Sequence, residues 1–572
     1  MLYNKNMKVL FNENWEFSEI PIKEELMYKD GKPVLFNPDD FLEASSKADY
    51  ESVNLPHDWM IYHTKDLYKN SVGCYKKRFI IEENDKINSL THFSLYFEGV
   101  YMNCGIWVNG QKAGEWKYGY ATFEVDISDF VHSGENEILL IAVYQSPNTR
   151  WYSGAGIFRD VYLIQTQNNF LVSDGTYFVA RPVCENELDG KWTVQFQTEI
   201  AGGKLSDEKI DFQKENYKIV HTIFDKDGTV FATTQDNSIS KIDDKETEYL
   251  HENIPSIKNF ALYKSDLKIT IEKPKIWSLE NPAFYVVKTE LIDGNDIVID
   301  SVEQNFGFKT FSFDKDKGFF LNGKHTKIFG ACQHHDLGAL GSAFDKNALR
   351  RQFQKLLEMG VNSIRCSHNP PPKAWMDLAD EMGILIDDEA FDMWEKPKTS
   401  FDYGNYFNDW CEKDTASWVR KDRNHPSLIM WSIGNEIYDT HMGNGFEITK
   451  KLYKIVERHD PCKNVLITIA SNYMMTDGAQ KCGTEIDVVG YNYLERLYDE
   501  HHKKYPQWKI YGSETGSTVQ SRGIYHFPES LKLVTFNDGQ CSTLGNCTAP
   551  WGATNTQTLI TQDRDCEFSA GQ

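Results

Sequence analysis

The sequence predicts a multidomain β plus α/β protein, in which two β-sandwiches precede a (β/α)8-type barrel that is truncated before its eighth strand. Three observations support this fold class. The 572 residues are too many for a single hydrophobic core. Residues 1–310 contain short alternating runs separated by turn signals, whereas strand and helix patterns alternate after residue 311. We therefore expect domains at 1–165, 166–310 and 311–572.

Residues 1–165 have an all-β pattern. Apolar and polar residues alternate in runs such as 92–100, 104–110 and 136–144, and the Asn109-Gly110 pair is a hairpin turn signal. Helical periodicity is poor in this part of the chain. We expect a β-sandwich of the jelly-roll type.

Residues 166–310 continue the strand pattern with a more charged surface. The clearest runs are 191–200, 217–225 and 283–293. Their spacing and alternation predict a second, smaller sandwich of the immunoglobulin type.

Residues 311–572 alternate between strand and helix patterns, which predicts parallel strands with crossover helices. Strands are expected at 326–332, 361–367, 384–390, 428–436, 464–471, 487–493 and 509–514, with helices at 346–360, 445–459 and 554–567 among others. Seven such units approach the eight of a β/α barrel. Because only Ser569 to Gln572 follow the last helix, we expect the eighth strand to be absent, either from a partial gene product or because a partner supplies it.

Composition excludes several classes of function. The formal net charge of −23 opposes binding to nucleic acid and to anionic membranes. Residues 1–17 lack a secretory h-region, and no apolar run is long enough to span a membrane. The 11 cysteines contain no Cys-x-x-Cys pair, which is typical of free thiols in a reducing compartment. We expect a cytoplasmic protein.

Two glutamates stand at the ends of predicted barrel strands, where active sites of this fold form. Glu436 ends the fourth strand and Glu514 ends the seventh, so they lie roughly across the barrel from each other. A pair of carboxylates about 5 Å apart cleaves glycosides with retention of configuration. A strand-end glutamate is more often a solvated charge or a helix cap, but both of these occur in distinctive sequence contexts.

Those contexts resemble glycoside hydrolase family 2, which includes β-galactosidases and β-glucuronidases. The segment WSIGNE (431–436), with NHPS (424–427) before it, is similar to the family's acid/base segment. Other matching segments occur in the family's order along the whole chain. Three are similar to the family's sugar-binding domain, so the resemblance implies a sugar-binding-like domain at 1–165: NLPHDW (54–59), FEGVYMNCGIWVNGQKAG (97–114) and GAGIFRDV (154–161). Three are similar to its first three barrel strands: GACQHHDLG (330–338), SIRCSHNPPP (363–372) and ILIDDEA (384–390).

The resemblance implies a retaining exo-β-glycosidase with a double-displacement mechanism. It assigns the general acid/base to Glu436 and a hydrogen bond with the sugar 2-hydroxyl to Asn435. The nucleophile falls at Glu514 within IYGSETGS (510–517). Arg365 is expected beside the nucleophile, to which Tyr493 or alternatively Tyr491 donates a hydrogen bond.

Further residues have two interpretations each. His334 and His368 match positions that contact sugar hydroxyls, although simple packing is the alternative. Asp388 and Glu389 are expected to brace the pocket floor more than to contact substrate. Trp394 is either a sugar platform or a packed core residue.

The sequence also departs from the family's pattern. The third-strand metal ligands of magnesium-dependent relatives are replaced by Met393 and Glu395, so we expect no required metal or other cofactor. Arg150 stands where relatives send an aspartate from the first domain into the pocket. The residues with which relatives distinguish sugars, an eighth-strand tryptophan and a later Asn-x-Lys pair, would follow Gln572.

We expect a carbohydrate substrate, most of all a β-galactoside. The alternatives are a β-glucuronidase or β-galacturonidase of the same family, and a non-catalytic carbohydrate-binding protein. The resemblance also allows a homo-oligomer.

Overall fold

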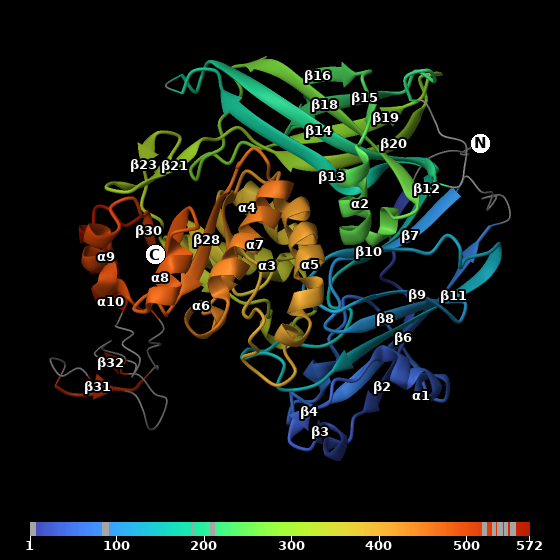
Figure 1. Cartoon of the computed structure of the whole chain (residues 1–572), viewed down its shortest axis with the longest axis horizontal. Helices are drawn as coiled ribbons and strands as arrows, with labels where there is room; N and C mark the ends of the chain where they lie inside the picture. The colour runs from blue at the N-terminus through green and yellow to red at the C-terminus, as the bar shows by residue number, and fades with distance from the viewer. Residues whose placement is uncertain are drawn as a thin grey trace.

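A computed structural model of the chain describes residues 7–82, 91–185, 187–205, 212–516, 523–528, 533–534, 542, 547–548 and 556–572. Two β-sandwiches, blue and green in Figure 1, lie against a yellow-to-red barrel of strands and helices. The order of elements along the chain confirms the predicted fold class. In the described ranges, no helix combines the length and the apolar composition that crossing a membrane requires.

The first sandwich consists of two antiparallel sheets. One has the order β5 (Glu51–Val53), β2 (Trp15–Pro21), β6 (Ser71–Ile81), β11 (Gly134–Tyr144), β8 (Cys104–Val108) and β9 (Gln111–Trp116). The other has the order β1 (Met7–Leu10), β12 (Val161–Gln167), β7 (Thr91–Phe97) and β10 (Phe123–Asp126). Asn109 and Gly110 form the predicted hairpin turn between β8 and β9, with positive φ angles of 50° and 79°.

The second sandwich also has two antiparallel sheets. One contains β13 (Asn169–Pro182), β14 (Lys191–Lys204), β18 (Phe260–Glu272) and β17 (Ser240–Lys241), and the other contains β16 (Val230–Asp236), β15 (Lys218–Asp225), β19 (Tyr285–Ile292) and β20 (Val298–Phe306). Alternate residues of β14, including Trp192, Val194 and Phe196, are fully buried between the sheets. The helix α2 (Asp244–Asn253) precedes β18.

The barrel begins after a small antiparallel sheet of β21 (Phe311–Asp314), β22 (Gly318–Leu321) and β23 (Lys324–His325), which the sequence did not predict. Its parallel strands then pair in chain order: β24 (Gly330–Gln333), β25 (Ser363–Cys366), β26 (Leu385–Glu389), β27 (Leu428–Asn435), β28 (Leu466–Ser471), β29 (Val488–Asn492) and β30 (Ile510–Glu514). These are the seven predicted strands. The connecting helices include α3 (Lys346–Glu358), α4 (Lys373–Met382), α5 (Phe407–Asp422), α6 (Asp439–Met442), α7 (Gly445–His459), α8 (Asp477–Gly483) and α9 (Tyr498–Lys504), and α10 (Thr556–Asp565) follows β30.

The helices form because their apolar residues recur at helical spacing. In α3, Asp345 caps the first turn by accepting a hydrogen bond from the Ala348 amide at 2.8 Å. Leu349 and Phe353, four residues apart, are fully buried against the sheet.

The eighth position of the barrel differs from the expectation. Ser569–Gln572 form parallel bridges with β30 on one side and with the residues before β24 on the other, and Figure 1 shows the C-terminus beside β30. The Ala570 amide donates to the Ile510 carbonyl at 2.8 Å, and the Ile328 amide donates to the Ala570 carbonyl at 3.0 Å. These four residues therefore pair with backbone N–H and C=O groups of β30 and of the segment before β24, which we expected to be unpaired strand edges.

The first sandwich is joined to the barrel by buried polar contacts. Trp116 donates to Asp414 of α5 at 2.8 Å, and Tyr118 donates to Asn369 at 2.9 Å. Arg159 donates to the Pro370 carbonyl at 2.8 Å. These contacts fix the position of the first sandwich relative to the carboxyl ends of the barrel strands.

Candidate active site

The carboxyl ends of the barrel strands bring six predicted residues into one hydrogen-bonded network. Three of them lie in strands β25, β27 and β30: Arg365, Asn435 and Glu514. The other three follow β25, β27 and β29 closely: His368, Glu436 and Tyr493. Glu436 and Tyr493 each follow a strand with a positive φ, 45° and 57° respectively. Such backbone strain in non-glycine residues is concentrated at functional sites.

Glu514 is surrounded by donors from the barrel. Arg365 reaches one carboxylate oxygen at 2.9 Å, and the Tyr493 hydroxyl donates to the other at 2.7 Å. The His368 Nε2 atom lies 3.7 Å from the same carboxylate. Burial alone would raise the pKa of Glu514, but the charges of Arg365 and His368 lower it to about 2. Glu514 is therefore ionised across the physiological pH range.

Glu389 holds Arg365 and His368 in place. The Arg365 guanidinium donates to both Glu389 oxygens, at 2.8 and 2.7 Å, and His368 Nδ1 lies 2.7 Å from this carboxylate. Ser432 also donates to Glu389 at 2.6 Å. Glu389 is fully buried, so it braces the pocket floor, as the sequence suggested.

Glu436 has partners from two domains. Asn492, at the end of β29, donates to its Oε1 at 3.3 Å, and Arg150 of the first sandwich donates to its Oε2 at 3.0 Å. Arg150 also forms an ion pair with Asp392 at 2.8 Å. Arg150 therefore bonds with two carboxylates, those of Glu436 and Asp392.

Asn435 is the centre of a second group of contacts. Its side-chain oxygen accepts hydrogen bonds from Arg365 and from Asn492, both at 3.0 Å. Its side-chain nitrogen donates to Asp392 at 2.8 Å. Lys398 donates to Asp392 at 2.8 Å and to the Asn435 carbonyl at 2.9 Å.

His334, His368 and Trp151 form an aromatic cluster beside Glu514. The ring centroids of Trp151 and His334 are 4.6 Å apart, and those of His334 and His368 are 5.2 Å apart. Burial lowers the pKa of His334 to about 4, so its ring is neutral at pH 7. Trp151 keeps 37% of its surface exposed.

Other candidates lie outside this network. Tyr491 bonds with His501 at 2.9 Å, so Tyr493 is the tyrosine that contacts Glu514. Trp394 is fully buried and donates to the Ile433 carbonyl at 2.9 Å, which excludes the platform interpretation. Asp388 is buried, and burial together with the charge of Asp422 raises its pKa.

A metal could be held, within the described residues, by the side chains of Asp377, Asp380 and His425. The oxygens of Asp380 already accept from His425 at 2.6 Å and from the Ser427 amide at 3.0 Å. A buried carboxylate that is saturated with donors in this way serves as a structural brace between α4 and the segment before β27.

Comparison with known families agrees with this arrangement. Three domain models of one family match in order: the sugar binding domain of glycosyl hydrolases family 2 at residues 34–167, the family 2 domain at 177–309, and its TIM barrel domain at 314–525. The chain belongs to glycoside hydrolase family 2. The family 2 chain is 32% identical to a β-galactosidase of Bacteroides ovatus, over 94% of this chain and 66% of the relative.

Two other relatives are longer than this chain. A putative β-glucuronidase of Formosa agariphila is 32% identical over 75% of this chain and 37% of its own length. The crystal structure of a family 2 member from Bacteroides cellulosilyticus, 30% identical, superposes with a TM-score of 0.73 over 89% of this chain and 62% of that one. The chain thus spans between about a third and two thirds of these relatives.

Sequence reasoning missed several residues of the site. Asp392, Lys398, Asn492 and Trp151 were not singled out, although Asn492 precedes Tyr493 at a strand end. The signal for Asp392 was its place just beyond the third strand. Trp151 adjoins Arg150, which the resemblance places toward the barrel site, but no motif distinguished Trp151 itself.

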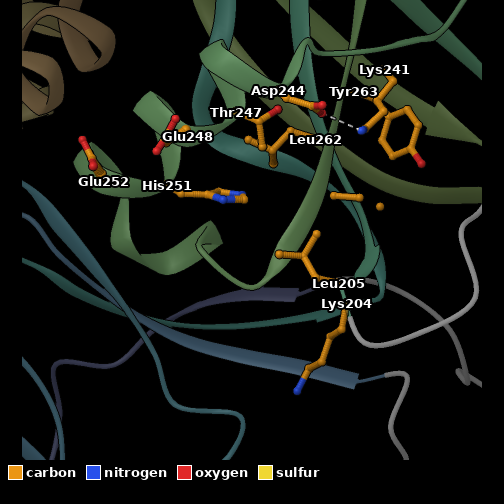
Figure 2. A pocket seen from close by; sticks show the side chains of 12 residues that line it. Lys204, Leu205, Lys241, Asp244, Thr247, Glu248, His251, Glu252, Leu262 and Tyr263 are labelled. Carbon is orange, nitrogen blue, oxygen red and sulfur yellow. Dashed lines mark hydrogen bonds and ion pairs between the residues drawn. The ribbon is translucent and has the colours of Figure 1, made fainter.

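A cavity of about 500 Å³ lies in the second sandwich, away from this network (Figure 2). Leu262 and Tyr263 of β18, Leu205 beyond β14, and Thr247 and His251 of α2 line it. An ion pair of 3.0 Å between Lys241 and Asp244 crosses its rim. Its lining does not include any of the site residues above, so the cavity does not belong to the barrel site.

Proposed function

We propose that the chain is a retaining exo-β-glycosidase in which Glu514 is the nucleophile and Glu436 the general acid/base. The observation that supports this most is the contrast between two strand-end carboxylates of one pocket. Glu514 is kept ionised by Arg365 and His368, with a pKa of about 2, whereas Glu436 contacts Asn492 of the barrel and Arg150 of the first sandwich. Double displacement requires one permanent carboxylate and one that exchanges a proton.

In the first step, Glu514 attacks the anomeric carbon while Glu436 gives its proton to the glycosidic oxygen. The bond to the leaving group breaks and a glycosyl ester forms on Glu514. Tyr493 and Arg365 hold the two carboxylate oxygens of Glu514 in a fixed orientation, so one lone pair is aimed at the sugar.

In the second step, Glu436 removes a proton from water, which attacks the same carbon and releases Glu514. Two inversions give net retention. Asn435 donates to the 2-hydroxyl, an interaction that strengthens as charge develops on the ring. We assign contacts with the remaining hydroxyls to His334 and His368, whose ring centroids lie 5.2 Å apart beside Glu514.

The proposed substrate class is a terminal β-galactoside. Support comes from the β-galactosidase relative, whose similarity extends over 94% of this chain. A β-glucuronide or β-galacturonide is the second candidate, because relatives named as β-glucuronidases are also similar, one of them 28% identical over 93% of the chain.

Parallel assays would test the activity and the substrate. The chain is incubated with the 4-nitrophenyl β-glycosides of galactose, glucuronic acid and galacturonic acid, and the configuration of the released sugar is followed by NMR. We expect β-configured product and the highest kcat/KM on the galactoside. Inverted product would refute the mechanism. Sugar binding without turnover would favour a non-catalytic carbohydrate-binding protein.

A further inference from the structure

Asp392 is a buried carboxylate on which donors from three parts of the molecule converge. Its Oδ1 accepts from Arg150 of the first sandwich, from Lys398 and from Asn435, each at 2.8 Å. Its Oδ2 accepts from the Arg150 Nε at 3.3 Å. Burial alone would raise the pKa of Asp392, but Lys398 and Arg150 lower it, so the group is an obligate acceptor.

These contacts determine which way the Asn435 amide faces. Its oxygen meets Arg365, which has only donors, and its nitrogen meets Asp392, which has only acceptors. A rotated amide would place donor against donor and acceptor against acceptor. One N–H group of the Asn435 side-chain amide donates to Asp392. The other N–H group of this amide has no acceptor within the described part of the chain.

We propose that Asp392 is a positioning residue, which orients Asn435 so that its remaining N–H donates to the substrate's 2-hydroxyl. This inference rests on the proposed glycosidase function. Without Asp392, the Asn435 amide loses the acceptor that fixes its nitrogen side, and a rotated amide would present its oxygen to the sugar. The hydroxyl contact would then be lost, although Asn435 is unchanged.

The test compares two substrates that differ in one hydroxyl group. The probes are the 4-nitrophenyl β-glycoside that the wild type hydrolyses fastest and its 2-deoxy counterpart. In Asp392→Ala we expect the ratio of kcat/KM for the parent over the 2-deoxy substrate to fall by about tenfold, the value of a hydrogen bond made in the transition state. Any general loss affects both substrates and cancels in the ratio.

Asp392→Asn is the matched control. Its side-chain oxygen can take the place of Oδ1, which faces Asn435, while its NH2 group replaces Oδ2, which faces only the Arg150 Nε. We expect this variant to keep the ratio within about threefold of the wild type, because the acceptor for Asn435 survives. Asp392→Ser replaces Asp392→Ala if the alanine variant is not recovered folded.

A double-mutant cycle completes the design. In an Asn435→Ala background, Asp392→Ala should leave the ratio unaltered, because the residue through which Asp392 acts is already gone. Equal losses on both substrates in Asp392→Ala, or an equal fall of the ratio in Asp392→Asn, would overturn the proposal. Turnover of neither substrate by the wild type would instead overturn the proposed function, and this inference with it.

Discussion

The two sides of the pocket differ in where their charged partners come from. On the Glu514 side, the cation Arg365 and the donor Tyr493 belong to the barrel itself. On the Glu436 side, the cation Arg150 comes from the first sandwich, 286 positions earlier in the chain. Glu514 is held by residues of its own domain, whereas Glu436 is held by Asn492 of the barrel and by Arg150 of the neighbouring domain.

This difference matches the proposed tasks of the two carboxylates. A nucleophile has to stay ionised and oriented, which a rigid set of barrel residues achieves. An acid/base has to take and release a proton in every cycle, and Glu436 contacts a cation whose side chain is 32% exposed at the domain boundary. Under the proposed mechanism, the first sandwich takes part in the chemistry through Arg150.

Removing either carboxylate gives the largest expected effect and distinguishes the two sides. We expect Glu514→Ala to lower kcat by on the order of 10⁴-fold or more, as loss of a nucleophile does. Added azide should occupy the space of the Glu514 carboxylate and give an α-glycosyl azide. Glu436→Ala should instead form the glycosyl ester and give a β-glycosyl azide.

NMR of the azide products is the measurement, with circular dichroism as a check of folding. A β-glycosyl azide from Glu514→Ala and an α-glycosyl azide from Glu436→Ala would show that the two roles are assigned the wrong way round.

The charge on the Glu514 side is tested by Arg365→Gln. Glu514 has a pKa lowered to about 2, so it stays ionised as the pH falls and protonates only near that value. Removing the cation should raise the pKa of Glu514 and move the acid limb of kcat/KM upward by about 1 to 3 pH units. At pH 7 we expect a loss of kcat/KM of about 100-fold, because the carboxylate is also misoriented.

Arg350→Gln is the control for this change. Arg350 pairs with Glu381 on the surface, at 2.6 Å, so its removal should leave the pH profile unaltered and cost less than about 1 kcal/mol. An acid limb that is the same in Arg365→Gln and in the wild type would contradict the assigned role of Arg365.

Tyr491 in β29 and Tyr493 just after it test whether the hydroxyl contact with Glu514 contributes to activity. Tyr493→Phe removes a donor to the ionised Glu514, and hydrogen bonds to charged groups contribute about 1.5 to 3 kcal/mol. We expect kcat/KM to fall by about 10- to 100-fold. Tyr491→Phe, whose hydroxyl bonds with His501, should change kcat/KM by less than about twofold. Equal losses in the two variants would mean that Tyr493 acts only through packing.

The sequence predicted the barrel well because its strands are short apolar runs that end in polar residues. The predicted strand 428–436 is observed as Leu428–Asn435, and 509–514 as Ile510–Glu514. Since the ends of parallel strands meet at one face, the strand pattern placed Glu436 and Glu514 at the same face of the barrel, and their sequence contexts supplied the prediction that they act as a pair.

What the sequence did not predict depends on contacts between distant segments. The contact of Arg150 with Asp392 joins positions 242 residues apart, and no local pattern encodes it. The occupation of the eighth barrel position by four residues after α10 was also missed, because so short a segment has no periodicity to detect. Trp394 was ambiguous for a different reason, since a tryptophan suits a core and a sugar face equally well.

Two tryptophans provide the smallest expected kinetic effect. Trp151 is 37% exposed and its ring centroid lies 4.6 Å from that of His334, so its indole is available to a sugar face. We expect Trp151→Ala to raise KM by about three- to tenfold while the melting temperature hardly changes, since a stacking contact of an aromatic ring contributes only about 0.5 to 1.5 kcal/mol. Trp394→Ala should show the reverse pattern, because a fully buried indole is lost and the free energy of unfolding falls by about 3 to 5 kcal/mol. Initial-rate kinetics and thermal unfolding of both variants measure this, and a KM that rises equally in both would mean that Trp151 supports the fold and does not contact the substrate.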